Sequence, residues 1–411
     1  PQLDFMVGTR NIKDLPDVIT DVYKRRKQVA KIQRDGISIE YTDKIKRRGR
    51  FHAWLPVMTG CDKECTFCIV PKTRGSEVSM PAREVCREAT RLVGEGVKWI
   101  TLLGQNVNSY RGEQSQDGKV APVPGAVNFN VIARSPTCGG TTKPASPAGG
   151  QSPIDGIASV ASFPRNGSQT SFPQLLEMLC QIEGLERISF TTSHPQDATA
   201  ELFQVIARNP KISRRFHLPL QSGSDRMLKR MKRMHTYEEF KQKIDLLRKL
   251  VPEISLTTDM IAGFSGESAD DHLANVRALE EIRFDSAFLY KYSVRPGTPA
   301  SKLVDDVPIP IKEKRLAELL KIQDRITTEE NRRWLGRTVE VFVEGHSPKK
   351  RCEVLGRSHE EKKVVCPGEA LLLGTFQKVK IIALRHQTFV GELCRPSACA
   401  GECGNGIHSK I

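Results

Sequence analysis

The sequence GCDKECTFC, residues 60–68, holds three closely spaced cysteines, Cys61, Cys65 and Cys68. The apolar run HAWLPVM, residues 52–58, comes directly before it and is typical of a buried β-strand. We therefore expect the cysteines on a loop that follows a strand. Because loops at the carboxyl ends of the strands carry the catalytic groups of α/β barrels, this position predicts a catalytic centre.

Three thiolates at this spacing can bind three irons of a 4Fe–4S cluster and leave the fourth iron without a protein ligand. The amino and carboxylate groups of S-adenosylmethionine can chelate such an open iron. One electron from the reduced cluster can then split the sulfonium and release a deoxyadenosyl radical. The alternative is a structural zinc site, which needs four ligands, usually in two spaced pairs. No second pair lies nearby, and His52 precedes the strand, so we expect it at the opposite end.

Short apolar runs alternate with amphipathic stretches from about residue 51 to residue 300. The predicted strands are 52–58, 98–104, 187–193, 216–222, 255–264 and 287–294. Apolar residues recur at helical spacing between them, as at Val85, Ala89 and Leu92. Six strands that alternate with helices predict an α/β fold, either a parallel barrel or a doubly wound sheet.

The pattern changes after a charged helix expected at about residues 311–333. Five short β-like runs then predict a small β-barrel: 338–345, 352–358, 362–368, 377–385 and 388–393. Two segments lack periodicity, and we expect a disordered insertion at about 118–171 and a flexible tail at 394–411. The tail cysteines could form a second cluster or a zinc site, but we interpret them as free thiols: Cys394, Cys399 and Cys403.

The chain of 411 residues carries 63 Lys and Arg against 48 Asp and Glu, a net charge of +15. Much of the excess lies between Lys24 and Arg50. Such a segment favours polyanions, usually nucleic acid, although a merely solvated basic surface is the alternative. No apolar stretch approaches the roughly 20 residues of a membrane helix. The 11 cysteines show no disulfide framework, which indicates a reducing compartment: the cytoplasm, or the mitochondrial matrix or another organelle if the protein is nuclear-encoded.

Several longer blocks make the sequence resemble the tRNA methylthiotransferases, radical S-adenosylmethionine (SAM) enzymes that insert a methylthio group into a C–H bond. The similarity covers about residues 1–117 and 172–393. The blocks are GCDKECTFCIVPKTRG (60–75), LLGQNVNSY (102–110), FTTSHP (190–195), HLPLQSGSD (217–225) with the following Met231, Lys232 and Arg233, TTDMIAGFSGES (257–268) and YSVRPGTPA (292–300). The resemblance implies an α/β radical SAM partial (β/α)6 barrel, followed by a small all-β TRAM barrel that binds RNA.

The resemblance also divides the chain into expected domains. Residues 1–50 correspond to the end of the family's N-terminal methylthiotransferase domain and a basic linker, and residues 51–333 to the radical SAM core. Residues 334–393 correspond to the TRAM-like barrel and residues 394–411 to the tail. The family's N-terminal domain holds an auxiliary 4Fe–4S cluster, thought to deliver the sulfur, through three further cysteines. No cysteine precedes Cys61, so we interpret the chain as a fragment that holds one cluster and expect a second only together with that domain.

Residue roles follow from the matching motifs. Cys61, Cys65 and Cys68 correspond to the ligands of the radical-generating cluster. The resemblance places Phe67 near the adenine of SAM, and Gln105 and Asn106 near its methionine end. The remaining candidates for SAM binding lie at expected strand ends: Ser193, His194, Gln221, Ser222, Asp259 and Gly263. The alternative role for the polar ones is that of a helix cap.

The sequence GQNVN, residues 104–108, resembles the branch that acts on isopentenylated adenosine next to the tRNA anticodon. The implied function is methylthiolation of that base by a monomeric protein, with a tRNA anticodon stem-loop and a reducing electron donor as partners and no membrane. One alternative is a methylthiotransferase for threonylcarbamoyladenosine or for a ribosomal protein. The other is a non-catalytic RNA-binding remnant.

Overall fold

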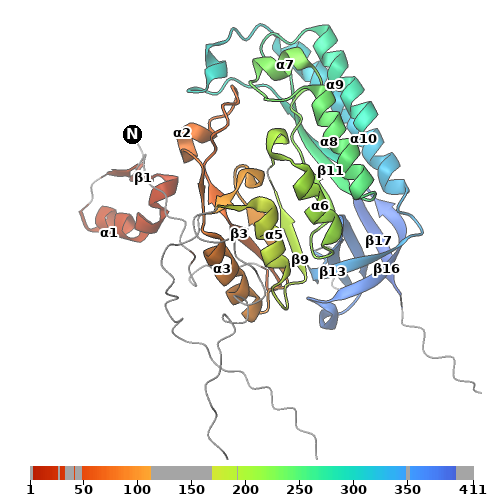
Figure 1. Ribbon diagram of the computed structural model, residues 1–411. Coiled ribbons are helices and arrows are strands. Elements are labelled where there is room, and N and C mark those ends of the chain that lie inside the picture. Colours follow the sequence, from red (N-terminus) through yellow and green to blue (C-terminus); the bar gives the residue numbers. More distant parts are fainter. Residues whose placement is uncertain are drawn as a thin grey trace, which may run out of the picture.

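The computed structural model describes residues 3–25, 28–32, 41, 49–112, 169–191, 193–348 and 352–394. Much of the basic segment 24–50, most of the expected insertion, and the tail with Cys399 and Cys403 lie outside the described residues. Figure 1 shows a central body of strands and helices, a small β-barrel at its lower end and a small N-terminal unit to one side.

Six parallel strands form the centre of the molecule. The strands β3 His52–Pro56, β6 Trp99–Leu103 and β9 Arg187–Phe190 make one sheet, and β10 Arg215–His217, β11 Ser255–Ala262 and β12 Ser286–Lys291 make another. A parallel bridge between Ile188 and Ile212 links the two sheets. Consecutive strands are therefore neighbours throughout, and within the described residues β3 and β12 do not pair. This arrangement is a partial (β/α)6 barrel and excludes the doubly wound sheet, whose strand order reverses.

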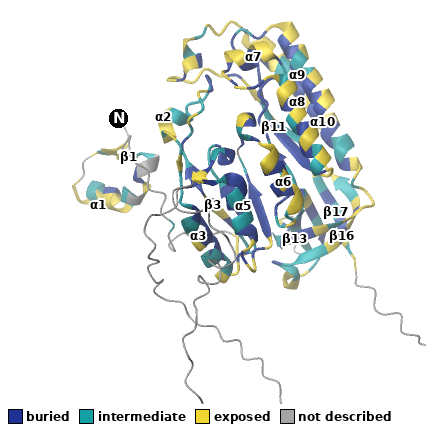
Figure 2. Ribbon diagram, in the orientation of Figure 1, coloured by how far each residue is buried: buried dark blue, intermediate teal, exposed yellow. Residues whose placement is uncertain are grey.

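Helices cover the outer face of the strands, and their exposed residues face away from the buried strands (Figure 2). They are α3 Ala82–Gly94, α5 Phe172–Cys180, α6 Ala200–Arg208, α8 Tyr237–Leu250, α9 Ala269–Ile282 and α10 Ile309–Arg332. Capping boxes at Ser171, Thr236 and Ser268 satisfy the first backbone N–H groups of three of them. None of the helices in the described part of the chain is both long and apolar enough to cross a membrane.

Short elements connect these strands and helices. They are β4 Met58–Thr59, α2 Val70–Arg74, β5 Val78–Ser79, η2 Val107–Ser109, β7 Arg111–Gly112, β8 Thr170–Ser171, η3 Pro195–Asp197, α7 Asp225–Arg230 and η4 Pro299–Lys302. Strand β8 pairs with β7, so the last two residues of the range expected to be disordered have regular structure. Strand β10 ends at His217, earlier than the predicted 216–222, because Pro219 has no N–H to continue the ladder.

The N-terminal unit is a small parallel pair of strands. It consists of β1 Phe5–Val7, η1 Thr9–Asp14, α1 Leu15–Arg25 and β2 Val29–Lys31. The helix connects two parallel strands, as in a βαβ unit.

The C-terminal strands close into a barrel, as the sequence predicts. Its members are β13 Thr338–His346, β14 Glu353–Ser358, β15 Lys363–Pro367, β16 Phe376–Arg385 and β17 Thr388–Leu393, in the order β13-β14-β15-β17-β16, with η5 Ala370–Leu372 before β16. Inward-facing Val341, Val364, Ile381 and Phe389 are buried and form its core. Closure removes the sheet edges that would otherwise expose unpaired backbone groups.

The C-terminal barrel is docked at the amino ends of the central strands. Arg187, the first residue of β9, is 1% exposed and donates to the carbonyls of Arg357 at 3.1 Å and Ser358 at 3.0 Å. Lys362 Nζ lies 2.6 Å from Asp285 Oδ1, just before β12. The two barrels therefore share a buried polar interface, at the end opposite to the cysteine loop.

Candidate active site

The cysteine loop leaves the central barrel after β3, through β4, which pairs with β5. Gly60 has φ +80°, and a Cβ there would lie 1.9 Å from the carbonyl oxygen of Ser76, so only glycine fits. The Gly60 N–H donates to Gln105 Oε1 at 2.7 Å, and the Cys61 N–H donates to the carbonyl of Gly75 at 3.0 Å. The start of the loop is therefore held by two neighbours, Gln105 after β6 and Gly75 before β5.

The three cysteines lie in different surroundings, with Cys65 buried and Cys61 and Cys68 half-buried. The Cys68 N–H donates to the carbonyl of Cys65 at 3.0 Å, and the Val70 N–H donates to Cys68 Sγ at 3.5 Å. Burial raises the pKa of the Cys61 thiol to about 11 and also raises the pKa of Cys68. These two thiols are therefore protonated at neutral pH before they bind metal, and metal binding releases their protons.

The number of ligands distinguishes a zinc ion from a cluster. Within the described residues, no group of three or more His, Cys, Asp and Glu side chains is arranged to hold a metal ion. A structural zinc site needs four ligands, whereas a 4Fe–4S cube can be held by three thiolates, each at a different iron. His52 lies at the far end of β3, as predicted, where its Nε2 is 2.8 Å from Thr101 Oγ1. His52 therefore does not supply the fourth ligand that a zinc site at the three cysteines would need.

A buried arginine, Arg233, lies against the cysteine loop and was not predicted to have a role. Its Nη1 is 3.4 Å from Cys65 Sγ, and its Nη2 donates to the carbonyl of Pro219 at 2.8 Å. Arg233 is only 7% exposed, and it follows α7 in a basic stretch that resembles a surface segment. The guanidinium therefore places a positive charge beside the cysteine loop. No local sequence signal could reveal this contact, because 168 residues separate its partners.

Gln105 and Asn106 come soon after β6, as predicted, and lie beside the cysteine loop. Asn106 Nδ2 donates to Asp197 Oδ2 at 2.6 Å, and the same carboxylate pairs with Lys63 Nζ of the loop at 2.9 Å. Asn106 is 2% exposed, and its Oδ1 has no hydrogen-bond partner in the described part of the chain. A buried acceptor of this kind is costly unless a bound group supplies a donor.

Ser193 and His194 follow β9 and are both buried. Ser193 Oγ donates to Asn108 Oδ1 at 3.3 Å, and His194 Nδ1 accepts from the Gln196 N–H at 3.2 Å, so His194 caps η3. Among the described residues, His194 Nε2, Asn108 Nδ2 and both ring nitrogens of His235 lack a partner. One side of the site therefore holds several buried polar atoms without a partner, and a polar cofactor could form hydrogen bonds with them.

The two buried histidines predict a loss of stability in acid. Burial, aided by Arg233 and Lys63, lowers the pKa of His194 to about 2, and burial lowers that of His235 to about 3. The unfolded chain titrates near 6.5 and therefore binds more protons than the folded chain below that pH. The contribution of the two neutral histidines to the free energy of unfolding is fully present above pH 6.5. It declines as the pH falls, by about 2 kcal/mol per histidine between pH 7 and pH 5.

Urea unfolding at the two pH values measures this loss. His235→Phe is expected to flatten the pH dependence by about half, because one of the two histidines is gone. The matched control is His346→Gln, at an exposed position on β13, which leaves the pH dependence unchanged. An unaltered slope in His235→Phe contradicts the assignment.

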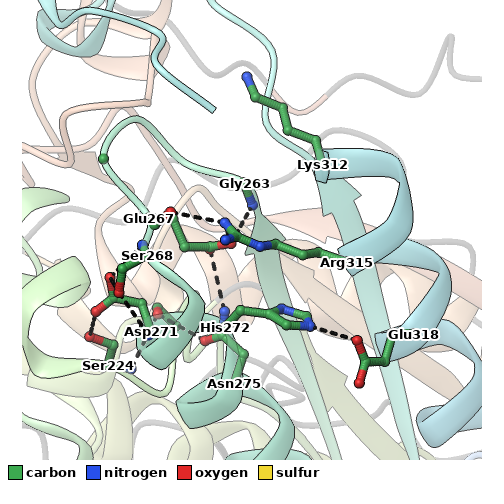
Figure 3. A network of polar contacts seen from close by, with 12 residues as sticks. Ser224, Gly263, Glu267, Ser268, Asp271, His272, Asn275, Lys312, Arg315 and Glu318 are labelled. Atoms are coloured by element: carbon green, nitrogen blue, oxygen red, sulfur yellow. Dashed lines mark hydrogen bonds and ion pairs between the residues drawn. The ribbon is translucent and has the colours of Figure 1, made fainter. Parts of the chain in front are cut away.

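The other candidates lie on the loops after β10 and β11, which share one polar support (Figure 3). Asn275 Oδ1 accepts from Ser222 Oγ at 2.9 Å and from the Gly223 N–H at 2.7 Å. Glu267 Oε1 accepts from the Gly263 N–H at 2.9 Å and from Arg315 Nη1 at 2.9 Å. The positions of Ser222 and Gly263 therefore depend on Glu267, Asn275 and Arg315, none of which was predicted.

Two backbone conformations in these loops are special. Gly263 has φ +72°, and a Cβ there would lie 2.4 Å from Lys312 Cγ of α10, so the close approach of that helix requires glycine. Gln221 has φ +71° although it is not a glycine. Its N–H donates to the carbonyl of Asp259 at 2.8 Å, which holds this unfavourable conformation. Such conformations are concentrated at functional sites.

Phe67 and Asp259 belong neither to the group beside the cysteine loop nor to the network around Glu267 and Asn275. Phe67 packs against a small apolar cluster that contains Met227, Met231, Phe264 and Tyr292. Asp259 Oδ2 lies 3.4 Å from His217 Nε2 on the inner face of the barrel. The structure therefore groups Gln105, Asn106, Ser193 and His194 near the cysteine loop and Gln221, Ser222 and Gly263 on the shared support.

The fold and the cysteine loop define a radical S-adenosylmethionine protein, and the sequence model of the Radical SAM superfamily matches residues 55–279. Two curated relatives are tRNA-2-methylthio-N(6)-dimethylallyladenosine synthases. That of Protochlamydia amoebophila is 37% identical over 96% of this chain and 76% of its own length. That of Pelotomaculum thermopropionicum is 35% identical over the same shares. The chain belongs to the family of tRNA-2-methylthio-N(6)-dimethylallyladenosine synthases.

Among solved structures, the radical S-adenosylmethionine methyltransferase TsrM from Kitasatospora setae is similar, with a TM-score of 0.45 and 13% identity over 72% of this chain and 52% of that chain. The family assignment rests on the sequence relatives and not on this likeness.

Proposed function

We propose that this protein is a radical SAM enzyme that adds a methylthio group to an isopentenylated (dimethylallyl) adenosine next to the anticodon of tRNA. The observation that carries the proposal is the loop after β3 that presents three free cysteines, the number of protein ligands that leaves one iron of a 4Fe–4S cluster open. Membership of the synthase family supports the reaction and the base.

The cofactors are one 4Fe–4S cluster and SAM. When bound, the cluster supplies the electron that splits SAM into methionine and a deoxyadenosyl radical. Cys61, Cys65 and Cys68 would hold the cluster, with the Arg233 guanidinium 3.4 Å from Cys65 Sγ.

SAM is held from two sides in this proposal. Asn106 Oδ1 would be free to accept a hydrogen bond from the methionine end of SAM, with Gln105, Ser193 and His194 as further contacts. Phe67 contacts the adenine. The loops of Gln221, Ser222 and Gly263 bind the rest of the molecule from across the barrel, together with Asp259. The unsatisfied polar atoms of Asn106 and His194 support this arrangement.

The other partners follow from the same proposal. Residues 334–393 form an RNA-binding TRAM-like barrel beside the core at 51–333, and residues 1–50 belong to the methylthiotransferase domain and its linker. The net charge of +15 supports binding of a tRNA anticodon stem-loop. A reducing protein supplies the electrons, and the enzyme works as a monomer in the cytoplasm.

Anaerobic reconstitution followed by mass spectrometry tests the function. The protein is incubated with SAM, dithionite, sulfide and tRNA that carries either dimethylallyladenosine or unmodified adenosine. We expect deoxyadenosine from this chain by itself, and a methylthio product, on the dimethylallylated tRNA alone, only once a domain that carries the auxiliary sulfur-delivering cluster is added. A product on threonylcarbamoyladenosine, or no deoxyadenosine under any reducing condition, contradicts the proposal.

A further inference from the structure

Arg233 is a buried cation without an anionic partner. It follows α7 and is 7% exposed. Its Nη2 donates to the carbonyl of Pro219 at 2.8 Å, its Nη1 lies 3.4 Å from Cys65 Sγ, and its Nε has no hydrogen-bond partner in the described part of the chain. Across the same residues, no carboxylate forms an ion pair with it. Because a buried charge is costly unless an opposite charge or a metal site balances it, Arg233 is suited to an anion bound beside it.

Two other arginines with little exposed surface show how such a charge is balanced elsewhere in the chain. Arg315, whose side chain is 12% exposed, pairs with Glu267 Oε1 at 2.9 Å. Arg187, which is 1% exposed, lies over two aromatic rings, 5.3 and 4.9 Å from their centroids. Among the residues that the structure describes, Arg233 has neither kind of partner, and its contact with a group that can become an anion is the one with the Cys65 sulfur.

The ionisable groups around Arg233 leave its charge unbalanced. Burial, aided by the charge of Arg233, lowers the pKa of His194 to about 2 and the pKa of His235 to about 3, so both rings are neutral at pH 7. The Asp197 carboxylate is already paired with Lys63 Nζ of the cysteine loop at 2.9 Å. The positive charge of Arg233 therefore remains in excess beside the cysteine loop.

Backbone hydrogen bonds fix the contact between Arg233 and Cys65. The Arg233 N–H donates to the carbonyl of Leu228 at 2.8 Å, which holds Arg233 at the end of α7. The cysteine loop is bound to the same turn, because the Thr66 N–H donates to the carbonyl of Met231 at 3.0 Å and Thr66 Oγ1 donates to the carbonyl one residue earlier at 3.2 Å. The turn that carries the guanidinium and the loop that carries the sulfur are therefore held together.

The reduction of a 4Fe–4S cluster responds to such a charge. Three thiolates make the cluster anionic, and reduction adds one electron and no proton, so the negative charge grows by one. A cation and an N–H donor at a ligand sulfur stabilise the reduced form more than the oxidised form. The reduction potential of the cluster rises as a result, and the reducing donor of the proposed function delivers its electron more readily.

We infer that Arg233 is a positioning residue that acts on the cluster through Cys65: it supplies the counter-charge and raises the reduction potential. The inference rests on the proposed function, because it requires the cluster bound by Cys61, Cys65 and Cys68. It adds to that function a residue outside the cysteine motif, which sets how readily the radical-generating electron enters the cluster.

A redox titration of the reconstituted full chain, without SAM and without RNA, tests the inference. Visible absorption and electron paramagnetic resonance of the reduced cluster give the midpoint potential. In Arg233→Gln, which removes the charge, the ratio of reduced to oxidised cluster at the wild-type midpoint should fall about tenfold, the effect of one charge-assisted hydrogen bond. This ratio corresponds to a midpoint lower by about 59 mV for one electron. Arg233→Lys keeps the charge and should retain most of the wild-type potential.

The matched control is Lys232→Gln, which removes one positive charge at the neighbouring residue. The Lys232 side chain is 55% exposed and pairs with Glu64. Solvent therefore screens its charge, and the potential should stay at the wild-type value. Iron and sulfide assays verify that each variant holds about four irons and four sulfides.

The outcomes separate the inference from the proposed function. Equal potentials in the wild type and Arg233→Gln, or the same decrease in Lys232→Gln, overturn the inference and leave the proposed function standing. Loss of iron in both Arg233→Gln and Arg233→Lys also overturns it, because Arg233 would then only hold the loop. A wild type that assembles no 4Fe–4S cluster overturns the proposed function together with the inference.

Discussion

Cys65→Ala is expected to abolish iron binding. The reconstituted wild type should hold about four irons and four sulfides per chain, with three of the irons bound by cysteine. Cys65 is the buried member of the triad and lies against the Arg233 guanidinium. Without its thiolate, one further iron loses its protein ligand, so that only two of the four are bound by cysteine, and a cluster held by two half-buried thiols does not survive. Iron and sulfide assays and the visible absorption spectrum measure the loss.

The chain offers matched controls for this substitution. Cys86 on α3 and Cys180 on α5 are also buried free thiols, and burial raises the pKa of Cys86 to about 12 and that of Cys180 to about 11. Alanine at either position should leave the iron content and the response of the spectrum to SAM unchanged. Stoichiometric zinc without iron in anaerobic preparations of the wild type would show that the cluster assignment is wrong.

The sequence predicted much of the fold because its signals were local. Alternation of apolar runs with amphipathic stretches located the six central strands, and the five C-terminal runs all became strands of one closed barrel. The choice between a barrel and a doubly wound sheet was not local. It depends on which strands are neighbours, and the bridge between Ile188 and Ile212 decides it.

The candidate site could be predicted only as far as motifs reach. The cysteines, Gln105 and Asn106 lie close together, as expected of groups at the carboxyl ends of neighbouring strands. Arg233 could not be predicted, because a basic residue in a basic stretch gives no sign of being buried. The docking of the C-terminal barrel on Arg187 was equally hidden, since its partners lie 170 and 171 residues away.

The network of Glu267, Asn275 and Arg315, which holds the loops after β10 and β11, was likewise not indicated by any sequence motif. Glu267 has a side chain with 0% exposure, and its partner Arg315 is 12% exposed. Burial raises the pKa of Glu267, but the Gly263 N–H and the Arg315 guanidinium, both at 2.9 Å, favour the charged form. Such a pair is sensitive to the loss of either member, because the remaining charge then stays buried and unpaired.

Glu267→Ala is therefore expected to lower the free energy of unfolding by about 3–5 kcal/mol. Glu267→Gln should cost less, because its carbonyl oxygen can still accept from the Gly263 N–H. Urea unfolding measures both, and Glu281→Ala, which removes only the exposed pair with Lys241 and the hydrogen bond from Tyr237 Oη, should cost no more than about 1 kcal/mol.

Glu267→Gln also tests whether Glu267 supports only the loops after β10 and β11 or the cysteine loop as well. Removal of the Glu267 carboxylate frees the backbone of Gly263 and weakens the contact with Asn275, whose Oδ1 holds Ser222 and Gly223. The cysteine loop takes no part in this network, so Glu267→Gln should retain its iron while its affinity for SAM falls about tenfold, the loss expected for one charge-assisted hydrogen bond. Titration of the cluster spectrum with SAM measures the affinity. Full affinity in Glu267→Gln would mean that the loops of Ser222 and Gly263 do not hold SAM, whereas loss of iron would mean that the support extends to the cysteine loop.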